Sequence, residues 1–353
     1  MRRRTFMRFV ACCVALLPVG TSVIAAESVL VSGPIVHDNL AIYFVHGQAT
    51  RGAVPVSLEE ALANGRVKVR ETGTVNELTV ENVGNDEIFI QAGDIVKGGR
   101  QDRVLSVDLL LPPRSGQLPI AAFCVESGRW SARGQEDSRQ FSTAAAAMPS
   151  HEAKLAIRSY MAAAPSTMPI GQANSADRSR ADTGSRQEQI WATVKKTQDR
   201  LARSVGATPA PASPSSLQLS LESDKLKAAQ AAYMSALQSG GALDHDVIGY
   251  VAAINGKISG GDVYSSSDLF RKMWPKLLAA SVTEAISDKA AQNATPPSAA
   301  GVGSFMTAAA SVPESERVLS ESVRVATRDG DGTLYAETRR PDGGWVHRNY
   351  LAK

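Results

Sequence analysis

The chain has 353 residues, of which 43% are hydrophobic, 5% aromatic and 21% charged, and its formal net charge at pH 7 is +3. Residues 1–26 hold four arginines and no acidic residue, so the rest of the chain carries about −1 (+3 − 4). The basic charge therefore belongs to the N-terminal segment, and the composition gives no argument for nucleic acid as a partner. A chain of this length forms one large domain or two smaller ones.

The N-terminal segment has the layout of a cleaved secretory signal peptide. Arginines within residues 1–8 precede the apolar run Phe9–Leu17, and small residues follow at 23–26. The apolar run is too short to span a bilayer. We therefore expect a signal peptide over residues 1–26, a periplasmic or secreted protein, and no transmembrane segment after cleavage.

Cysteine usage fits an exported protein without disulfides. Once Cys12 and Cys13 leave with the signal peptide, Cys124 is the single thiol, so it cannot form an internal disulfide. It follows the apolar run "LPIAAF", which indicates a small buried residue in a strand.

Residues 40–125 show a strand pattern in which short β-branched and aromatic runs alternate with turn-forming breaks. One helix interrupts them at "SLEEALANG", with Ser57 as N-cap and Gly65 after its end. Breaks at Gly84 and Gly116 would turn the chain in an antiparallel sandwich or roll. The expected strands are LAIYFVHG, RVKVRET, ELTVENVG, EIFIQAG, RVLSVDLLLPP and LPIAAFCVE.

Beyond Trp130 apolar residues recur every three or four positions, which predicts helices. The helical stretches are "PSHEAKLAIRSYMAAA", "SRQEQIWATVKKTQDRLARSV" and "SLQLSLESDKLKAAQAAYMSALQSGG", separated by loops rich in Pro, Ser and Ala. The fold class that follows is α+β, with an antiparallel sandwich or roll-like N-terminal half on which helices and a late β-hairpin pack.

The hairpin is predicted from Val247 to Tyr264 around the turn Asn255-Gly256. The helix after it contains Pro275, so a kink or break is expected near Trp274. The domain organisation that we predict is a family domain over 35–290, β-rich over 35–130 and helical with the hairpin over 150–290. A linker over 291–316 and a short β-rich extension over 317–353, with three strands, would complete the chain.

The segment "AGDIVKGGRQDRVL" combines acids, bases and glycines beside aliphatic residues. Its GxxxxG spacing is not a phosphate loop, because Gly99 and Arg100 stand where Lys-Ser/Thr is needed and a strand pattern follows. Simpler anion binding remains open: Arg100 and Arg103 as clamps, with amide hydrogens of Gly98 and Gly99 beside them. The alternative is a solvated hairpin tip whose charges neutralise one another.

Other polar groups near this segment complete the candidate site. Gln101 would orient the ligand, and Asp94 would hold an arginine or serve as an acid or base. "FCVESGRW" adds Glu126 as a second candidate acid or base and Arg129 as a third ligand-binding arginine. Arg103 has a structural alternative as a member of a buried ion pair.

Metal and hydrolase motifs are missing from the sequence. The five histidines have no HxH or HExxH spacing, and no GxSxG segment occurs. No motif implies a cofactor, and no metal site is predicted.

Several segments together resemble the ADP-ribosylglycohydrolase- and rhodanese-phosphatase-superfamily-associated protein family, first subtype. The matching segments are GDIVKGGRQDRVL, FCVESGRW, FSTAAAAMPS, RQEQIWATV and DLFRKMWPKLL, in the family's order over roughly residues 35–290. The tail lies outside this resemblance. The resemblance implies a role linked to nucleotides or ADP-ribose and assigns no catalytic residue.

Two functions of different classes remain open. In the first, the protein binds an anionic small molecule such as a nucleotide or ADP-ribose derivative, with or without catalysing a reaction on it. Alternatively it is a non-catalytic module that meets an envelope protein or polymer. The first gains if Asp94, Gln101, Arg103, Glu126 and Arg129 share one cleft.

Export is the direct test of the N-terminal pattern. N-terminal sequencing of protein recovered from the periplasm should begin close to Ala26 or Glu27, because the small residues there suit signal peptidase. Recovery of the full-length chain from the cytoplasm would contradict the prediction.

Overall fold

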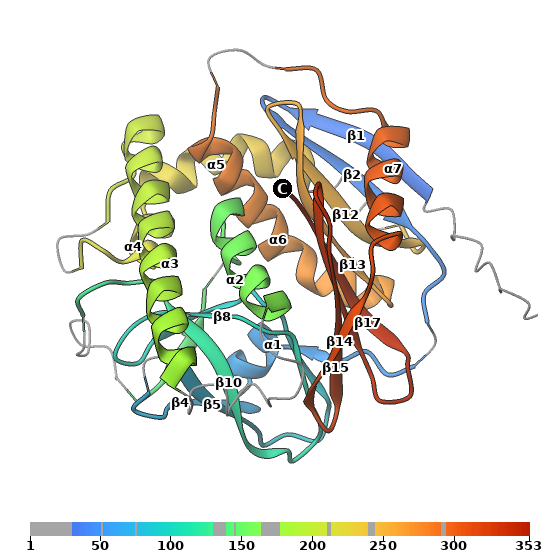
Figure 1. Ribbon diagram of the computed structural model, residues 1–353. Helices are drawn as coiled ribbons and strands as arrows, with labels where there is room; N and C mark the ends of the chain where they lie inside the picture. The colour runs from blue at the N-terminus through green and yellow to red at the C-terminus, as the bar shows by residue number, and fades with distance from the viewer. Residues whose placement is uncertain are drawn as a thin grey trace, which may run out of the picture.

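The computed structural model describes residues 30–50, 52–74, 76–129, 139–144, 146–163, 177–209, 213–238, 244–290 and 294–353. The expected signal peptide lies outside these residues. The described part of the chain is α+β, as the sequence predicted, with strands in antiparallel sheets and a nearly closed, barrel-like N-terminal sheet (Figure 1).

The helices are α1 (Leu58–Ala63), α2 (His151–Ala163), α3 (Asp177–Val205), α4 (Leu217–Leu221), α5 (Asp224–Leu237), α6 (Ser267–Ser287) and α7 (Ala299–Ala310). The first eleven strands are β1 (Leu30–His37), β2 (Leu40–His46), β3 (Val56–Ser57), β4 (Val67–Glu71), β5 (Glu77–Asn82), β6 (Ile88–Ile90), β7 (Ile95–Gly98), β8 (Arg103–Leu105), β9 (Leu109–Leu111), β10 (Gly116–Cys124) and β11 (Phe141–Thr143). The later strands are β12 (Val247–Ile254), β13 (Lys257–Tyr264), β14 (Ser315–Ser320), β15 (Val323–Asp329), β16 (Thr333–Arg339) and β17 (Trp345–Ala352).

The largest sheet joins distant parts of the chain in the order β1-β2-β12-β13-β17-β16-β15-β14. Strand β2 is apolar at every position from 40 to 45 because both faces of the sheet are covered. Leu40, Ile42 and Phe44 belong to the core that includes α6, whereas Ala41 and Tyr43 belong to the core that includes α7. Figure 1 shows these two helices on opposite sides of the sheet.

The N-terminal half forms a six-stranded sheet in the order β11-β7-β8-β10-β5-β4 and a small sheet β3-β6-β9. All pairs are antiparallel except β3 with β6. Helices α2 and α3 pack together, and α3 also contacts β10. The N-terminal sheets and the large sheet therefore face a shared interior that the helices close.

Local signals in the sequence account for several element ends. Ser57 caps α1 in a capping box with Glu60, and the hydroxyl of Ser150 accepts a hydrogen bond from the amide of Ala153 at 3.3 Å. The β12–β13 hairpin turns at Asn255 and Gly256, whose φ angles of 51° and 75° are the positive values of a type I′ turn. These helix and hairpin predictions are confirmed.

The structure differs from the prediction in four elements. The single helix expected from residue 216 is two helices, because Ser223 caps a new one through the amide of Leu226. Helix α6 continues through Pro275, so of the expected kink or break the break does not occur. The segment predicted as a linker contains α7, and the tail has four strands, all of them in the large sheet.

Candidate functional site

The loop that joins β7 to β8 is buried. Gln101, Asp102 and Arg103 have no exposed surface, and only Arg100 lies on the outside. Apart from Arg100, the tip of this hairpin is therefore not solvated, and every buried charge in it requires a partner within the protein.

Partners for the loop come from β4 and from the turn after β10. The guanidinium of Arg103 donates to the side-chain oxygen of Gln101 at 3.1 Å and lies 3.4 Å from a carboxylate oxygen of Glu71. Gln101 donates to the backbone oxygen of Glu126 at 3.0 Å. Arg129 lies 2.7 Å from the Glu126 carboxylate. The structure thus brings Gln101, Arg103, Glu126 and Arg129 together.

Residues from the segment before α4 close this cluster. Ser216 donates to Asp102 at 3.2 Å, and Ser213 donates to Glu126. Asp102 also lies 3.6 Å from Arg129. The cluster joins the hairpin loop to the helical region through polar contacts made within the chain.

The glycines of the loop are required by close packing. A Cβ atom at Gly98 would lie 2.5 Å from the carbonyl oxygen of Gln140, and one at Gly99 would lie 2.2 Å from the ring of Phe141. Their amides donate to Asp102 at 2.9 Å and to Gln140 at 3.2 Å. The amide hydrogens expected to hold an anion are therefore already bonded within the chain.

Asp94 does not join this cluster, because it precedes β7 at the opposite end of the strand. It is buried, accepts a hydrogen bond from Lys276 of α6 at 2.5 Å, and accepts the amide of Gln91 at 3.0 Å. Of the five residues expected in one cleft, Asp94 is the one that lies elsewhere.

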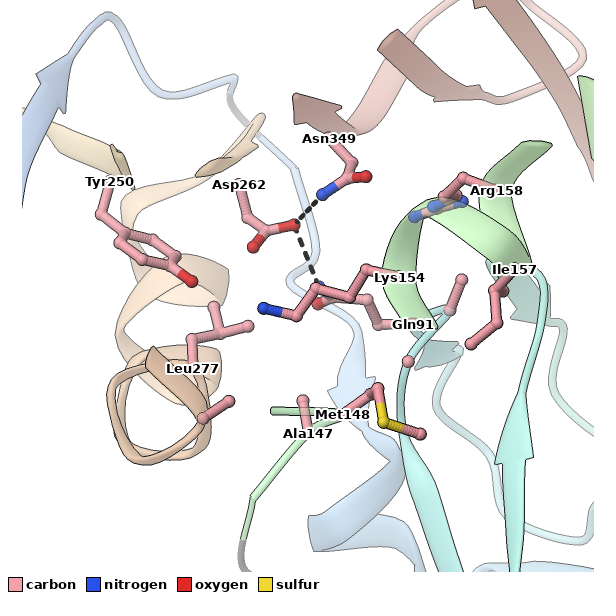
Figure 2. A pocket seen from close by; sticks show the side chains of 13 residues that line it. Gln91, Ala147, Met148, Lys154, Ile157, Arg158, Tyr250, Asp262, Leu277 and Asn349 are labelled. Carbon is pink, nitrogen blue, oxygen red and sulfur yellow. Dashed lines mark hydrogen bonds between the residues drawn. The ribbon is translucent and has the colours of Figure 1, made fainter. Parts of the chain in front are cut away.

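A polar cavity lies where β12, β13 and β17 meet α2, α6 and the segment after β6 (Figure 2). The free volume of the cavity is about 30 Å³, room for one or two water molecules, and all the space between its lining atoms, open solvent included, is about 430 Å³. The polar side chains that line it are Gln91, Lys154, Arg158, Tyr250, Asp262 and Asn349.

Asp262 is held rigidly at this cavity. One carboxylate oxygen accepts hydrogen bonds from Asn349 at 2.8 Å, His347 at 3.0 Å and Gln91 at 3.2 Å. Figure 2 shows the other oxygen turned towards Tyr250 and the tip of Lys154. Burial alone would raise the pKa of Asp262, but His347 and Asn349 outweigh it and lower the pKa below its ordinary value.

His347 bridges two carboxylates behind the cavity wall. Its ring nitrogens lie 2.7 Å from Asp108 and 3.0 Å from Asp262, and the ring stacks on Tyr264. Burial alone would lower the pKa of His347, but the two carboxylates raise it above its ordinary value. The imidazole is therefore favoured as a cation that donates from both nitrogens.

Two further ion pairs hold the lining cations. Arg158 donates to Asp108 at 3.0 Å, and Lys154 donates to Glu284 at 3.0 Å. Burial opposes ionisation of Asp108, yet the charges of Arg158 and His347 hold its pKa far below the usual range. Lys154 retains 24% exposure of its side chain and is the lining cation nearer to solvent.

The lining offers donors and acceptors with fixed protonation. Burial, followed by the charge of Asp262, raises the pKa of Tyr250 well above its ordinary value, so the phenol keeps its proton. Lys154 is a second donor, and Asp262 is an acceptor. Over the part of the chain that the structure describes, no group of three or more His, Cys, Asp or Glu is arranged to hold a metal ion.

The sequence did not reveal Asp108, Asp262 and His347 as a group because they are far apart in the chain. Asp108 is the one charged residue in "LSVDLLLPP", and Asp262 follows two glycines within a strand; both are signals that could have been used. The glycine is needed because a Cβ at position 261 would lie 2.3 Å from the backbone oxygen of Tyr250. Cys124, by contrast, is buried as expected, and burial raises its pKa to about 11.

The comparisons place the chain in one family. Residues 28–351 match the ARG and Rhodanese-Phosphatase-superfamily-associated Protein domain, ARPP-1, and the chain belongs to this family. The match includes the tail, which the sequence reading had left outside. No curated protein and no solved structure matches the chain significantly. Among the described helices, none is both long and apolar enough to cross a membrane.

The burial of Arg103 predicts a structural role that can be measured. Arg103→Ala should lower the free energy of unfolding by about 3–5 kcal/mol, because it leaves Glu71 and Gln101 without their partner. Arg100→Ala, on the exposed side of the same loop, is the matched control and should change stability by less than about 0.5 kcal/mol. Denaturant titration measures the free energy of unfolding of both variants. Equal values for the two would contradict the structural role of Arg103.

The bridge at His347 predicts a pH dependence of stability. Because its pKa is raised in the folded state, His347 contributes fully to the free energy of unfolding below about pH 6.5, the ordinary histidine value. This contribution is lost as the pH rises through the folded-state pKa. The pKa of Asp108 is lowered in the folded state, so its pH dependence has the opposite sign. Its contribution to the free energy of unfolding is lost as the pH falls below about 3.9.

Thermal melts should therefore show that the stability difference between wild type and His347→Gln shrinks as pH rises above 6.5. The slope should approach about 1.4 kcal/mol per pH unit between the two pKa values. His245→Gln, on the surface, is the control and should follow the wild-type profile. A difference that stays constant from pH 5 to 9 would show that His347 is not held as a cation.

Proposed function

We propose that this protein binds a small anionic ligand, of the nucleotide or ADP-ribose class, in the polar cavity between α2, α6 and β12–β13–β17. The observation that carries the proposal is a set of fixed, charged side chains around a space open to solvent. Such preorganised polar groups in a concave site are typical of ligand recognition. The loop at 98–103 is a weaker candidate, because its polar groups bond to one another.

The charges around the cavity balance one another, and Lys154 is the cation among them that an anionic ligand can reach. Lys154, Arg158 and a protonated His347 balance Asp108, Asp262 and Glu284. Arg158 lines the cavity but is buried, and His347 is buried behind the wall, whereas Lys154 lines the cavity and is partly exposed. An anionic group at the mouth would therefore share Lys154 with Glu284.

The family association supports the ligand class. ARPP-1 domains are named for their association with ADP-ribosylglycohydrolase and rhodanese-phosphatase superfamilies, which points to ADP-ribose or related nucleotides. The arginine-rich N-terminal segment supports action outside the cytoplasm, on a ligand present there.

A thermal-shift measurement tests the proposal. ADP-ribose, AMP, ribose 5-phosphate and inorganic phosphate are added to the mature protein, and binding to the native state raises its melting temperature. Lys154→Met should abolish the shift because it removes the cation at the mouth. Lys227→Met, an exposed lysine of α5, is the matched control and should keep it.

The Lys154 variant leaves Glu284 buried without its cation, so a second variant separates binding from stability. Lys154→Met with Glu284→Gln removes both charges of the pair and should fold without restoring the shift. A shift of wild-type size in this double variant, or no shift of the wild type by any of the four compounds, would refute the proposed function.

A further inference from the structure

Three polar side chains at one end of the large sheet are hydrogen-bonded in series. Ser32 of β1 has its Oγ 2.7 Å from Nε2 of His46, the last residue of β2. Nδ1 of the same ring lies 2.9 Å from Oδ2 of Asp246, which directly precedes β12. The three strands are neighbours in the sheet (Figure 1). None of these three residues lines the polar cavity, so they form a separate site.

The two contacts fix which nitrogen of His46 carries the proton. An ionised carboxylate only accepts hydrogen bonds, so the neutral ring donates to Asp246 from Nδ1. Nε2 is then the acceptor for the hydroxyl hydrogen of Ser32. A serine that donates to an imidazole, which in turn donates to a carboxylate, is the arrangement that makes a serine hydroxyl nucleophilic in enzymes.

The sheet holds the three groups in place. The amide of Gly47 donates to the backbone oxygen of Asp246 at 2.9 Å, which keeps that residue beside the end of β2. Ser32 is exposed, whereas only 15% of the His46 side chain is exposed. A reactant in solution can therefore reach the hydroxyl, and its base is held within the fold. The residues are separated by 14 and 200 positions in the chain, so only the tertiary structure brings them together.

We propose that Ser32, His46 and Asp246 form an esterase site for carboxylic esters with a short aliphatic acyl group. Oγ of Ser32 attacks the acyl carbon, and its proton passes to Nε2 of His46. The bond from this carbon to the alcohol oxygen breaks as that oxygen takes the proton from Nε2. Water then attacks the acyl-serine, again giving its proton to Nε2. The carboxylic acid leaves, and the proton returns to Oγ of Ser32.

The surroundings of Ser32 indicate this class of substrate. Leu30 lies opposite His46 in the β1–β2 register and shares a sheet face with Ser32, two positions further on. It is 64% exposed, the largest value among the large hydrophobic residues that the structure describes, so an aliphatic acyl group can pack on it. The site is open to water, where an oxyanion is stabilised less than in a closed site. Esters fit this better than amides, because an alcohol leaves more readily than an amine.

Covalent labelling with a fluorophosphonate tests the nucleophile. Oγ of Ser32 attacks phosphorus, fluoride leaves and the proton passes to His46, so the adduct stays on the protein and peptide mass spectrometry locates it. We expect the mature wild-type protein to be labelled at Ser32, and Ser32→Ala to lose this label. Ser315→Ala, at an exposed position of the other edge strand β14, is the matched control and should be labelled at the wild-type rate.

The rate of labelling tests the base and the carboxylate. His46→Gln should slow labelling of Ser32 by at least about 100-fold, the factor that a general base contributes. Asp246→Asn should slow it by about tenfold or more, because an amide that donates to Nδ1 favours the wrong tautomer. Asp246 is 63% exposed, so this variant should fold, and it decides alone if His46→Gln does not.

Hydrolysis of 4-nitrophenyl acetate and butyrate tests the reaction. The wild type should hydrolyse both, with kcat/KM at least about threefold higher for butyrate because two more CH₂ groups are partly buried. Ser32→Ala should abolish hydrolysis, and Leu30→Ser should remove the preference for butyrate.

The outcomes are distinct from those of the cavity. No label at Ser32, or equal labelling of the wild type and Asp246→Asn, would refute the activated serine. Labelling without ester hydrolysis would refute the esterase reaction, and equal kcat/KM for the two esters would refute the role of Leu30. None of these results depends on a ligand in the cavity, so the proposed function stands or fails separately.

Discussion

The imidazole of His347 between Asp108 and Asp262 is the interaction on which the interior depends. It joins the segment before β9, strand β13 and strand β17, which are separated by 85 to 239 positions in the chain. Two buried carboxylates facing each other would repel strongly without a cation between them. Arg158 and Thr338 donate further hydrogen bonds to Asp108, and Asn349 and Gln91 donate to the same oxygen of Asp262 as His347. A buried network of this kind is tolerated only when its members are bonded.

The network lies where the two halves of the architecture meet. Gln91 follows β6 and Asp108 precedes β9 in the N-terminal half, whereas Asp262 and His347 come from the large sheet and Arg158 from α2. Around it, apolar side chains of both cores exclude water, which strengthens each electrostatic contact. The cavity opens at this junction, and its lining is therefore fixed by elements from both halves rather than by a mobile loop. The proposed ligand would bind to groups that the fold already holds in place.

The charged segment at residues 94–103 illustrates how burial changes the meaning of a pattern. Its acids and bases resemble those of an exposed turn or an anion site, but Glu71 at the end of β4 and Arg129 after β10 supply partners for Arg103 and Asp102. The cluster thus joins β4, β7–β8 and β10 to the segment before α4. Apart from Arg100, which is exposed, its charged residues form ion pairs within the chain. For Arg103 this matches the structural alternative that the sequence also allows.

The sequence by itself determined the fold class, the family, most strands of the N-terminal half and the β12–β13 hairpin. These follow from local rules: the period of apolar residues, the serine caps and a turn that needs positive φ at Asn255 and Gly256. Only the tertiary structure decided that the tail completes the large sheet, that α7 covers its second face, and that Asp108, Asp262 and His347 meet. Strand pairing over more than 200 residues and the bridging of two buried carboxylates by one imidazole depend on distance in space, and no local pattern in the chain encodes that distance.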